Sequence, residues 1–392
     1  MINVFKFAHL PEIHFGPGSI RKSIQLIKKY GNNILLVTGR SSFSKSEWGN
    51  KFLKDIESSD IKYEIVGVDG EPTTLFIDKV VHMFRNKLPD VVVSVGGGSV
   101  LDAGKAVSAM IPVEGETWDY IEGNPEMKPH PGNKVPFIAI PTTSGTGSEA
   151  TKNAVLLTTG DPVLKRSLRH ENFVPDISII DPALTLECPA DVTAASGLDA
   201  ITQLLEAYVS TQASAMTDAL AYSGLEHGVR SIRRVVEDGN DLEGRSDLAY
   251  AALMSGIVLA NAGLGVIHGF ASVLGGYYGI PHGVICGTLL GAATRINIEK
   301  LRETGSIEEF TDKYARAGEL FTADDNCKSK NICLMSLADG LDELIDDLQM
   351  PRLGKFGVKA SHISSLAGET GVKNNPVDLD CNDLEKILES RL

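Results

Sequence analysis

Short apolar runs alternate with longer helical patterns through the first half of the chain. Five runs, at 33–38, 63–68, 90–95, 135–140 and 176–180, are short, β-branched and bounded by glycine, proline or polar residues. Their length and branching favour buried strands over helix turns. Strands separated by helical stretches are typical of an α/β fold with a parallel sheet. We therefore predict an α/β domain with a parallel sheet over residues 1–187.

Beyond residue 187 the strand-like runs stop. The chain continues in amphipathic or wholly apolar helical patterns rich in alanine and leucine, such as 218–235 and 247–260. This periodicity predicts an all-α second domain over residues 188–392. The boundary is expected in DPALTLECPADVTA, where two prolines interrupt the pattern.

Composition narrows the possible partners. The chain has 392 residues, long enough for two domains, and a formal net charge of -14, which disfavours nucleic acid or an anionic membrane. No apolar run approaches the roughly 20 residues that span a bilayer. The N-terminus MINVFKFAHLPEIHF lacks the features of a secretory signal. We expect a cytoplasmic protein with a small-molecule substrate.

The five cysteines give no sign of a specialised role. Their number is odd and their spacing never CxxC, so neither a disulfide framework nor a thiolate zinc site is indicated. We expect all five to be reduced and structural; they are Cys188, Cys286, Cys327, Cys333 and Cys381.

The strongest local signal is DVVVSVGGGSVLDAGKAV at 90–107. A buried strand runs into three glycines and a serine, and a helix follows at once. Backbone amides at a helix N-terminus can bind a pyrophosphate there without meeting a Cβ atom. The contact candidates are Gly96, Gly97, Gly98 and Ser99. The alternative is a tight turn that binds nothing.

A second loop, IPTTSGTGSEAT at 140–151, also follows an apolar strand. Its hydroxyls suit hydrogen bonds to a ribose, phosphate or carboxamide, although such a loop can also serve only to cap a helix. The hydroxyl residues are Thr142, Thr143, Ser144, Thr146 and Ser148. Two such loops on neighbouring strand ends favour one shared ligand.

Four motifs together carry a family resemblance. GGGSVLDAGK, PTTSGTGSEAT, GLDA…EAYVS and GLGVIHGFAS…YYGIPHGV occur in this order along nearly the whole chain. The sequence thereby resembles the iron-containing alcohol dehydrogenases. The resemblance implies NAD(P)-dependent interconversion of an alcohol and an aldehyde or ketone, with a metal and substrate site in a cleft between an α/β and a helical domain. It also implies a homo-oligomer, a dimer or larger.

The stretch VTGRSS bears on the choice between NAD and NADP. Many NAD-preferring members have an aspartate where this chain has Gly39, and such a carboxylate repels a 2′-phosphate. Arg40 follows, and its guanidinium can bind a phosphate unless it is a solvated surface charge. We predict that NADP is favoured over NAD. Lys165 matches a family lysine near the cofactor.

The resemblance also implies a metal site with a departure in it. Family members hold the metal with an aspartate, a histidine four residues later and two further histidines. Asp199, His268 and His282 match three of these, whereas Gln203 stands at the second position. A neutral amide oxygen is a weak ligand, suited at best to a hard cation or a metal-bound water. We predict Asp199, His268 and His282 as catalytic metal ligands for iron or zinc, with Gln203 assisting.

A second departure leaves the catalytic chemistry open. Ser272 stands where members often have a proton-relaying histidine, which favours a polar substrate over simple alcohols. Glycerol dehydrogenases manage with three metal ligands, whereas maleylacetate reductases indicate that a metal-independent reductase is also possible. A metal-dependent lyase resembling dehydroquinate synthase is a rival class of enzyme, and a dinucleotide-binding sensor is a rival without catalysis.

Overall fold

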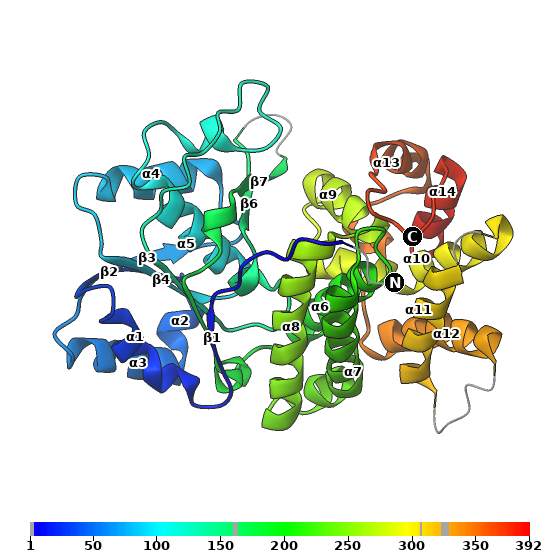
Figure 1. The fold of residues 1–392 in the computed structure, drawn as a ribbon, viewed down its shortest axis with the longest axis horizontal. Coiled ribbons are helices and arrows are strands. Elements are labelled where there is room, and N and C mark those ends of the chain that lie inside the picture. The colour runs from blue at the N-terminus through cyan, green and yellow to red at the C-terminus, as the bar shows by residue number, and fades with distance from the viewer. Residues whose placement is uncertain (1–3, 160–163, 306–307, 323–328) are drawn as a thin grey trace. The chain divides into compact units, whose positions relative to one another are not determined.

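The computed structural model describes residues 4–159, 164–305, 308–322 and 329–392. The chain divides into two compact units. One is Ala8–Cys188, and the other is Pro189–Leu392 with the N-terminal stretch that ends at Phe7. Figure 1 shows strands in the first unit and helices in the second.

The first unit is built on a six-stranded sheet in which every neighbouring pair is parallel. The strand order is β1-β8-β5-β4-β2-β3. The strands are β1 (Glu12–Phe15), β2 (Asn33–Gly39), β3 (Lys62–Val68), β4 (Val91–Gly96), β5 (Phe137–Pro141) and β8 (Ile177–Ile180). A separate antiparallel hairpin pairs β6 (Asn153–Leu157) with β7 (Lys165–Arg169). Because β4 and β5 are neighbours, the loops that follow them leave the same edge of the sheet.

Helices cover both faces of this sheet (Figure 1). Successive residues of β2 divide between two apolar cores: Leu35 packs with α4 (Thr74–Phe84) and α5 (Gly98–Met110), and Leu36 with α1 (Ser23–Ile27) and α3 (Glu47–Glu57). The short α2 spans Ser42–Lys45. Strands buried on both faces are apolar at most positions, which is why the sequence pattern finds β2, β4, β5 and β8.

All five predicted strands are confirmed, as β2, β3, β4, β5 and β8. Sequence reasoning missed β1 and the β6–β7 hairpin. β1 is four residues long, at an edge of the sheet, and largely exposed or half-buried. β7 has the sequence KRSLR, whose polar residues hide the strand signal.

The second unit is all-helical among its described residues. Its helices are α6 (Ala190–Tyr208), α7 (Ala215–Glu237), α8 (Leu242–Ala262), α9 (Val266–Tyr278), α10 (His282–Thr304), α11 (Glu308–Gly318), α12 (Lys330–Asp347), α13 (Ile363–Glu369) and α14 (Cys381–Ser390). The helical patterns predicted at 218–235 and 247–260 lie within α7 and α8. The predicted fold class, a parallel α/β part followed by an all-α part, is confirmed.

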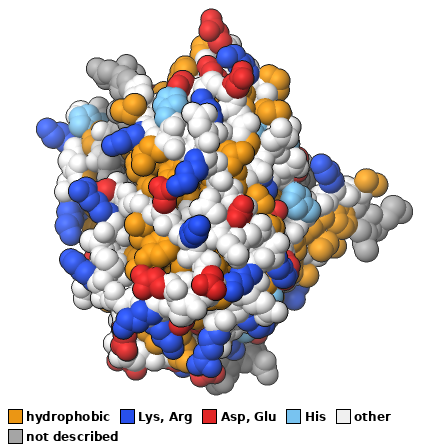
Figure 2. Space-filling view, turned by 90° about the vertical axis from the view of Figure 1, so that its left-hand side faces the viewer, with side chains coloured by type: hydrophobic (Ala, Val, Ile, Leu, Met, Phe, Trp, Pro, Cys, Tyr) orange, Lys and Arg blue, Asp and Glu red, His pale blue; other side chains and the backbone are white. Residues whose placement is uncertain are grey.

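Charged side chains are spread over the surface seen in Figure 2, and no single described helix is of the membrane-spanning kind. Figure 2 shows basic and acidic side chains interspersed over one face, with small apolar patches between them. In the part of the chain that the structure describes, no single helix is long and apolar enough to cross a membrane; only α8 and α9 taken together pass that test, and they are bent by 101° at their junction.

Candidate metal centre and dinucleotide loops

Three helices of the second unit bring four potential ligands together. Asp199 lies on α6, His268 on the first turns of α9, and His282 and Cys286 on the first turns of α10. One ligand atom from each lies within 4.8 Å of the others. Asp199 and Cys286 are buried, His268 is mostly buried, and the side chain of His282 is 35% exposed. The cluster is therefore reachable from the side of His282.

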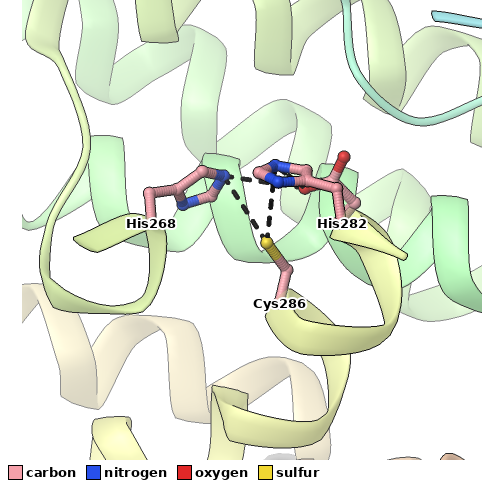
Figure 3. Close-up of side chains that lie close together, drawn as sticks. His268, His282 and Cys286 are labelled. Carbon is pink, nitrogen blue, oxygen red and sulfur yellow. Dashed lines mark hydrogen bonds and ion pairs between the residues drawn. The ribbon is translucent and has the colours of Figure 1, made fainter. Parts of the chain in front are cut away.

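The ligand atoms surround a small space. Oδ1 of Asp199 is 3.6 Å from Nε2 of His268 and 3.6 Å from Nε2 of His282. Sγ of Cys286 is 3.7 Å from each of the same two nitrogens. In Figure 3 the Cys286 thiol points toward both imidazole rings. Asp199 Oδ1 is buried and has no hydrogen-bond partner among the described residues, which is a costly state unless a cation is bound there.

These spacings fit one tetrahedral ion. Zinc lies about 2.0–2.2 Å from nitrogen and oxygen ligands and about 2.3 Å from sulphur, which gives tetrahedron edges of roughly 3.4 Å between N and O and roughly 3.6 Å between N and S. The observed edges of 3.6 and 3.7 Å are close to these values. The residues present therefore fit a divalent metal.

Sequence reasoning missed Cys286. His282 and Cys286 are four residues apart on α10, so they lie on one helical face, as Asp199 and Gln203 do on α6. That spacing is the signal that could have found it. The absence of a CxxC motif instead groups Cys286 with the structural cysteines. Of the other cysteines, Cys188 and Cys381 are not disulfide-bonded. Cys333 is disulfide-bonded, so the expectation that all five are reduced is wrong. Cys327 is not among the described residues.

Gln203 is buried one turn after Asp199 on α6. Its Oε1 accepts a hydrogen bond of 2.9 Å from Ser255 Oγ on α8. The oxygen predicted to assist the metal is thus bonded to a neighbouring helix.

Two glycines let α10 approach α6 beside Asp199. A Cβ at Gly283 would lie 2.5 Å from the carbonyl oxygen of Ala195, and a Cβ at Gly287 would lie 2.8 Å from Leu198 Cδ1. Only glycine permits this close backbone approach. The glycines around the histidine motif therefore serve to position ligands from two helices on one point.

Glu206 fixes the orientation of His268. Its Oε2 is 2.6 Å from His268 Nδ1, and its Oε1 accepts a 2.7 Å hydrogen bond from the backbone N–H of Ile267. With Nδ1 hydrogen-bonded to a carboxylate, Nε2 is the nitrogen left to face the cluster. This is the arrangement that usually supports a metal-ligating histidine.

The side chains of the cluster stabilise the charged forms of one another. Burial opposes ionisation of Asp199, but the neighbouring His282 and His268 outweigh it and lower the pKa of the carboxyl. Burial likewise opposes charging of His268, yet Cys286 and Glu206 raise the pKa of the imidazole well above its ordinary value. The pKa of His282 is raised by Cys286 and Asp199 against the effect of burial.

Ser272 does not face a proton-relay partner in the described structure. Its exposed hydroxyl donates a 3.1 Å hydrogen bond to the carbonyl oxygen of His268 on the same helix. A hydroxyl used in this way is not a general base.

In the first unit, the two glycine- and hydroxyl-rich loops pack against each other. The N–H of Thr142 donates to the carbonyl of Gly96 at 3.0 Å, and a Cβ at Gly98 would lie 2.7 Å from Thr146 Oγ1. A Cβ at Gly96 would lie 2.6 Å from Val100 Cβ, so the turn itself requires that glycine. Helix α5 has Gly97 as its N-cap and begins at Gly98, with Ser99 in its first turn and no side-chain cap. Its first amides can therefore face an anion.

A buried lysine on α5 makes hydrogen bonds to the end of the second loop. Lys105 Nζ donates to Ser148 O, Ser148 Oγ, Thr151 Oγ1 and Asn153 O at 2.8–3.0 Å. Ser148 Oγ also donates to Asp102 at 2.6 Å, so Ser148 supports the loop. Thr142 and Thr143 are half-buried, and the buried Ser144 Oγ has no hydrogen-bond partner among the described residues. An unsatisfied hydroxyl here fits a loop that binds a polar ligand.

The other predicted cofactor residues have carboxylate partners. Arg40 Nη1, just past Gly39 at the end of β2, forms a highly exposed ion pair of 2.9 Å with Asp69. Lys165 Nζ, at the start of β7, is 2.5 Å from Glu71 Oε1.

A parallel α/β unit with a glycine-rich loop between strand and helix, together with a helical unit that carries a cluster of potential metal ligands, fits the architecture of a dinucleotide- and metal-dependent dehydrogenase. The chain belongs to the iron-containing alcohol dehydrogenase family. The family model for iron-containing alcohol dehydrogenases matches residues 11–182, and the model for the C-terminal part of that family matches residues 193–392.

Relatives agree with this membership over almost the full chain. A 1,3-propanediol dehydrogenase of Citrobacter freundii is 32% identical over 91% of this chain and 90% of its own. An NADPH-dependent butanol dehydrogenase of Clostridium saccharobutylicum is 30% identical over 98% of this chain and 97% of its own. A crystal structure of a 1,3-propanediol oxidoreductase covers 100% of both chains with a TM-score of 0.88 and 30% identity. The protein is an NAD(P)-dependent oxidoreductase that acts on alcohols and their carbonyl counterparts, in a family that uses iron or another divalent metal.

Proposed function

We propose that this dehydrogenase transfers hydride between NADP(H) and a polar alcohol or carbonyl compound, with Asp199, His268 and His282 holding a divalent metal. The observation that carries the proposal is the buried Oδ1 of Asp199, which receives no hydrogen bond within the described residues and lies 3.6 Å from Nε2 of both histidines. A metal-independent reductase would have no need to bury a carboxylate oxygen without a hydrogen bond at the point where two imidazoles converge.

When bound, the metal supplies Lewis acidity, which stabilises the negative charge that develops on the carbonyl oxygen during hydride transfer. The chain's own residues prepare the site. Glu206 holds His268 with Nε2 facing the cluster, and the burial of Asp199 excludes water from its carboxylate. His282, the most exposed of the three side chains, lies on the side from which a substrate can approach.

The two loops of the first unit would hold the dinucleotide. The first turn of α5, with Gly97, Gly98 and Ser99, offers amides to the pyrophosphate. The hydroxyls of the Thr142–Thr146 loop offer hydrogen bonds to the ribose or carboxamide. The absence of a carboxylate at Gly39 and the presence of Arg40 favour NADP. A relative described as NADPH-dependent supports this choice.

A polar substrate follows from Ser272 and from the relatives. With Ser272 in place of a histidine, proton transfer depends on water or on a hydroxyl of the substrate itself. A substrate that carries a second hydroxyl meets this need, and a relative is described as a 1,3-propanediol dehydrogenase. As expected from the sequence, we place the enzyme in the cytoplasm as a homo-oligomer.

Metal removal tests this proposal. We expect exhaustive chelation to lower kcat/KM with NADPH and a hydroxyaldehyde by roughly 100-fold or more, since Lewis-acid assistance is worth several kcal/mol. Stoichiometric Zn²⁺ or Fe²⁺ should restore the rate, and Asp199→Asn should abolish that restoration. The matched control is Asp191→Asn, an exposed aspartate on the same helix. Full activity in protein that elemental analysis finds metal-free would contradict the proposal.

A further inference from the structure

We infer that Cys286, as a thiolate, is the fourth protein ligand of this metal, so that the ligand missing from α6 at Gln203 is supplied by α10. The inference rests on the metal site proposed above and adds a ligand to it. Two observations support it: the convergence of four ligand atoms, and the buried carboxylate oxygen of Asp199, one of those four, which receives no hydrogen bond within the described residues.

The distances place Cys286 at a corner equivalent to the others. Its sulphur is 3.7 Å from Nε2 of His268 and 3.7 Å from Nε2 of His282, nearly the same as the 3.6 Å that separates each nitrogen from Asp199 Oδ1. An S–H group can donate its one proton to only one of these two nitrogens, whereas both distances are close to the N–S edge of roughly 3.6 Å expected around one zinc ion. Figure 3 shows the sulphur pointing into the space between the rings.

The backbone of Cys286 lies against α6. Cys286 is fully buried, and its carbonyl oxygen lies 3.4 Å from Oγ1 of Thr202, three residues after Asp199. The Thr202 hydroxyl donates to the carbonyl of Leu198 at 2.7 Å. The glycine that follows it, Gly287, leaves no room for a Cβ beside Leu198. The thiol is therefore held at a set depth between the two helices that carry Asp199 and His282.

Gln203 is the weaker competitor for the same coordination position. Its amide oxygen is neutral and already accepts a hydrogen bond from Ser255 at 2.9 Å. A thiolate is charged and a far better ligand for zinc than an amide oxygen. The fourth ligand of this chain thus comes from α10, whereas in other family members it comes from the position of Gln203 on α6. The number of protein ligands stays at four.

The exchange changes the metal that the site prefers. A soft thiolate favours zinc over iron in a site that otherwise contains imidazole and carboxylate. One carboxylate and one thiolate also balance the charge of a divalent ion, whereas one carboxylate and three imidazoles leave a positive charge of one. We therefore expect the protein as purified to hold zinc.

Cobalt substitution tests the thiolate bond without reference to activity. We expect metal-free wild-type protein to bind one equivalent of Co²⁺ with a near-ultraviolet sulphur-to-cobalt charge-transfer band. Cys286→Ser should bind Co²⁺ without that band and bind Zn²⁺ at least about tenfold more weakly. The matched controls, Cys188→Ser and Cys381→Ser, remove thiols outside the cluster and should keep the band.

The outcomes separate the two proposals. Bound Co²⁺ without a charge-transfer band in the wild type, or a band that survives Cys286→Ser, would overturn the Cys286 assignment and leave the metal proposal standing. A wild-type protein that binds neither Co²⁺ nor Zn²⁺ would overturn both.

Discussion

We expect single side chains to decide which metal and which dinucleotide this dehydrogenase prefers. At the metal cluster, the amide of Gln203 replaces an imidazole, and the thiol of Cys286 lies where a fourth ligand belongs. At the end of β2, Gly39 removes a carboxylate and Arg40 adds a guanidinium. Each of these substitutions exchanges one functional group and leaves the fold of the family in place.

Arg40 provides the test of cofactor choice. Its ion pair with Asp69 is about three-quarters exposed on both sides and so contributes at most about 1 kcal/mol, which lets a 2′-phosphate recruit the guanidinium. We expect Arg40→Ala to lower kcat/KM for NADPH about tenfold with little change for NADH. Asp69→Asn should raise the preference for NADPH. Steady-state kinetics with both cofactors measures the change, and Arg21→Ala, another exposed arginine of the first unit, is the control.

An unchanged preference for NADPH over NADH in Arg40→Ala would contradict this role of Arg40. Gly39→Asp gives an independent check, since the restored carboxylate should shift the preference toward NADH. The added Cβ would contact only the hydroxyl of Ser42, a flexible side-chain end that can rotate away.

The sequence predicts part of the metal site and misses part of it. Asp199, His268 and His282 come from the family resemblance, and the structure brings their ligand atoms together. Cys286 could not be found from thiol spacing because its partners lie on three helices. Its four-residue distance from His282 becomes informative only once α10 is known to begin at His282.

Glu206 of α6 caps the N-terminus of α9 and orients His268 on that helix. The N-cap of α9, Gly265, has no side chain to cap the helix, and Glu206 accepts the N–H of Ile267 instead. The same carboxylate bonds to His268 Nδ1. One side chain therefore joins two helices and orients His268, a predicted metal ligand.

Glu206→Gln separates these two roles. Its oxygen can still accept the Ile267 N–H, but its NH₂ group would face His268 Nδ1 and disfavour the tautomer that leaves Nε2 free. We expect Zn²⁺ to bind roughly 10- to 100-fold more weakly, with a much smaller change in thermal stability. Competition titration with a chromophoric chelator measures the affinity. Glu226→Gln on the exposed face of α7 is the control, and an unchanged Zn²⁺ affinity in Glu206→Gln would show that Glu206 only caps the helix.

The strands illustrate which elements a sequence pattern can predict. β2, β4, β5 and β8 are buried along most or all of their length and read as continuous apolar runs. β1 and β7 are short and contain charged residues, so tertiary pairing, rather than local preference, makes them strands. The loops that follow the strand ends were predictable, but the packing of Gly98 on Thr146 was not, because it joins the first turn of α5 to the loop that follows β5.

The chain as a whole combines an unaltered architecture with an altered metal centre. Its first compact unit contains the two loops predicted to bind the cofactor, its second contains the potential metal ligands, and the family match extends over both. A scaffold of this kind tolerates a change of ligand provided that the number and geometry of ligands are kept.

The coordination shell of the metal can be measured directly by X-ray absorption spectroscopy on the zinc-loaded protein in solution. We predict one sulphur at about 2.3 Å and three nitrogen or oxygen neighbours at about 2.0–2.1 Å, from Cys286, His268, His282 and Asp199. A shell of nitrogen and oxygen alone would contradict the account.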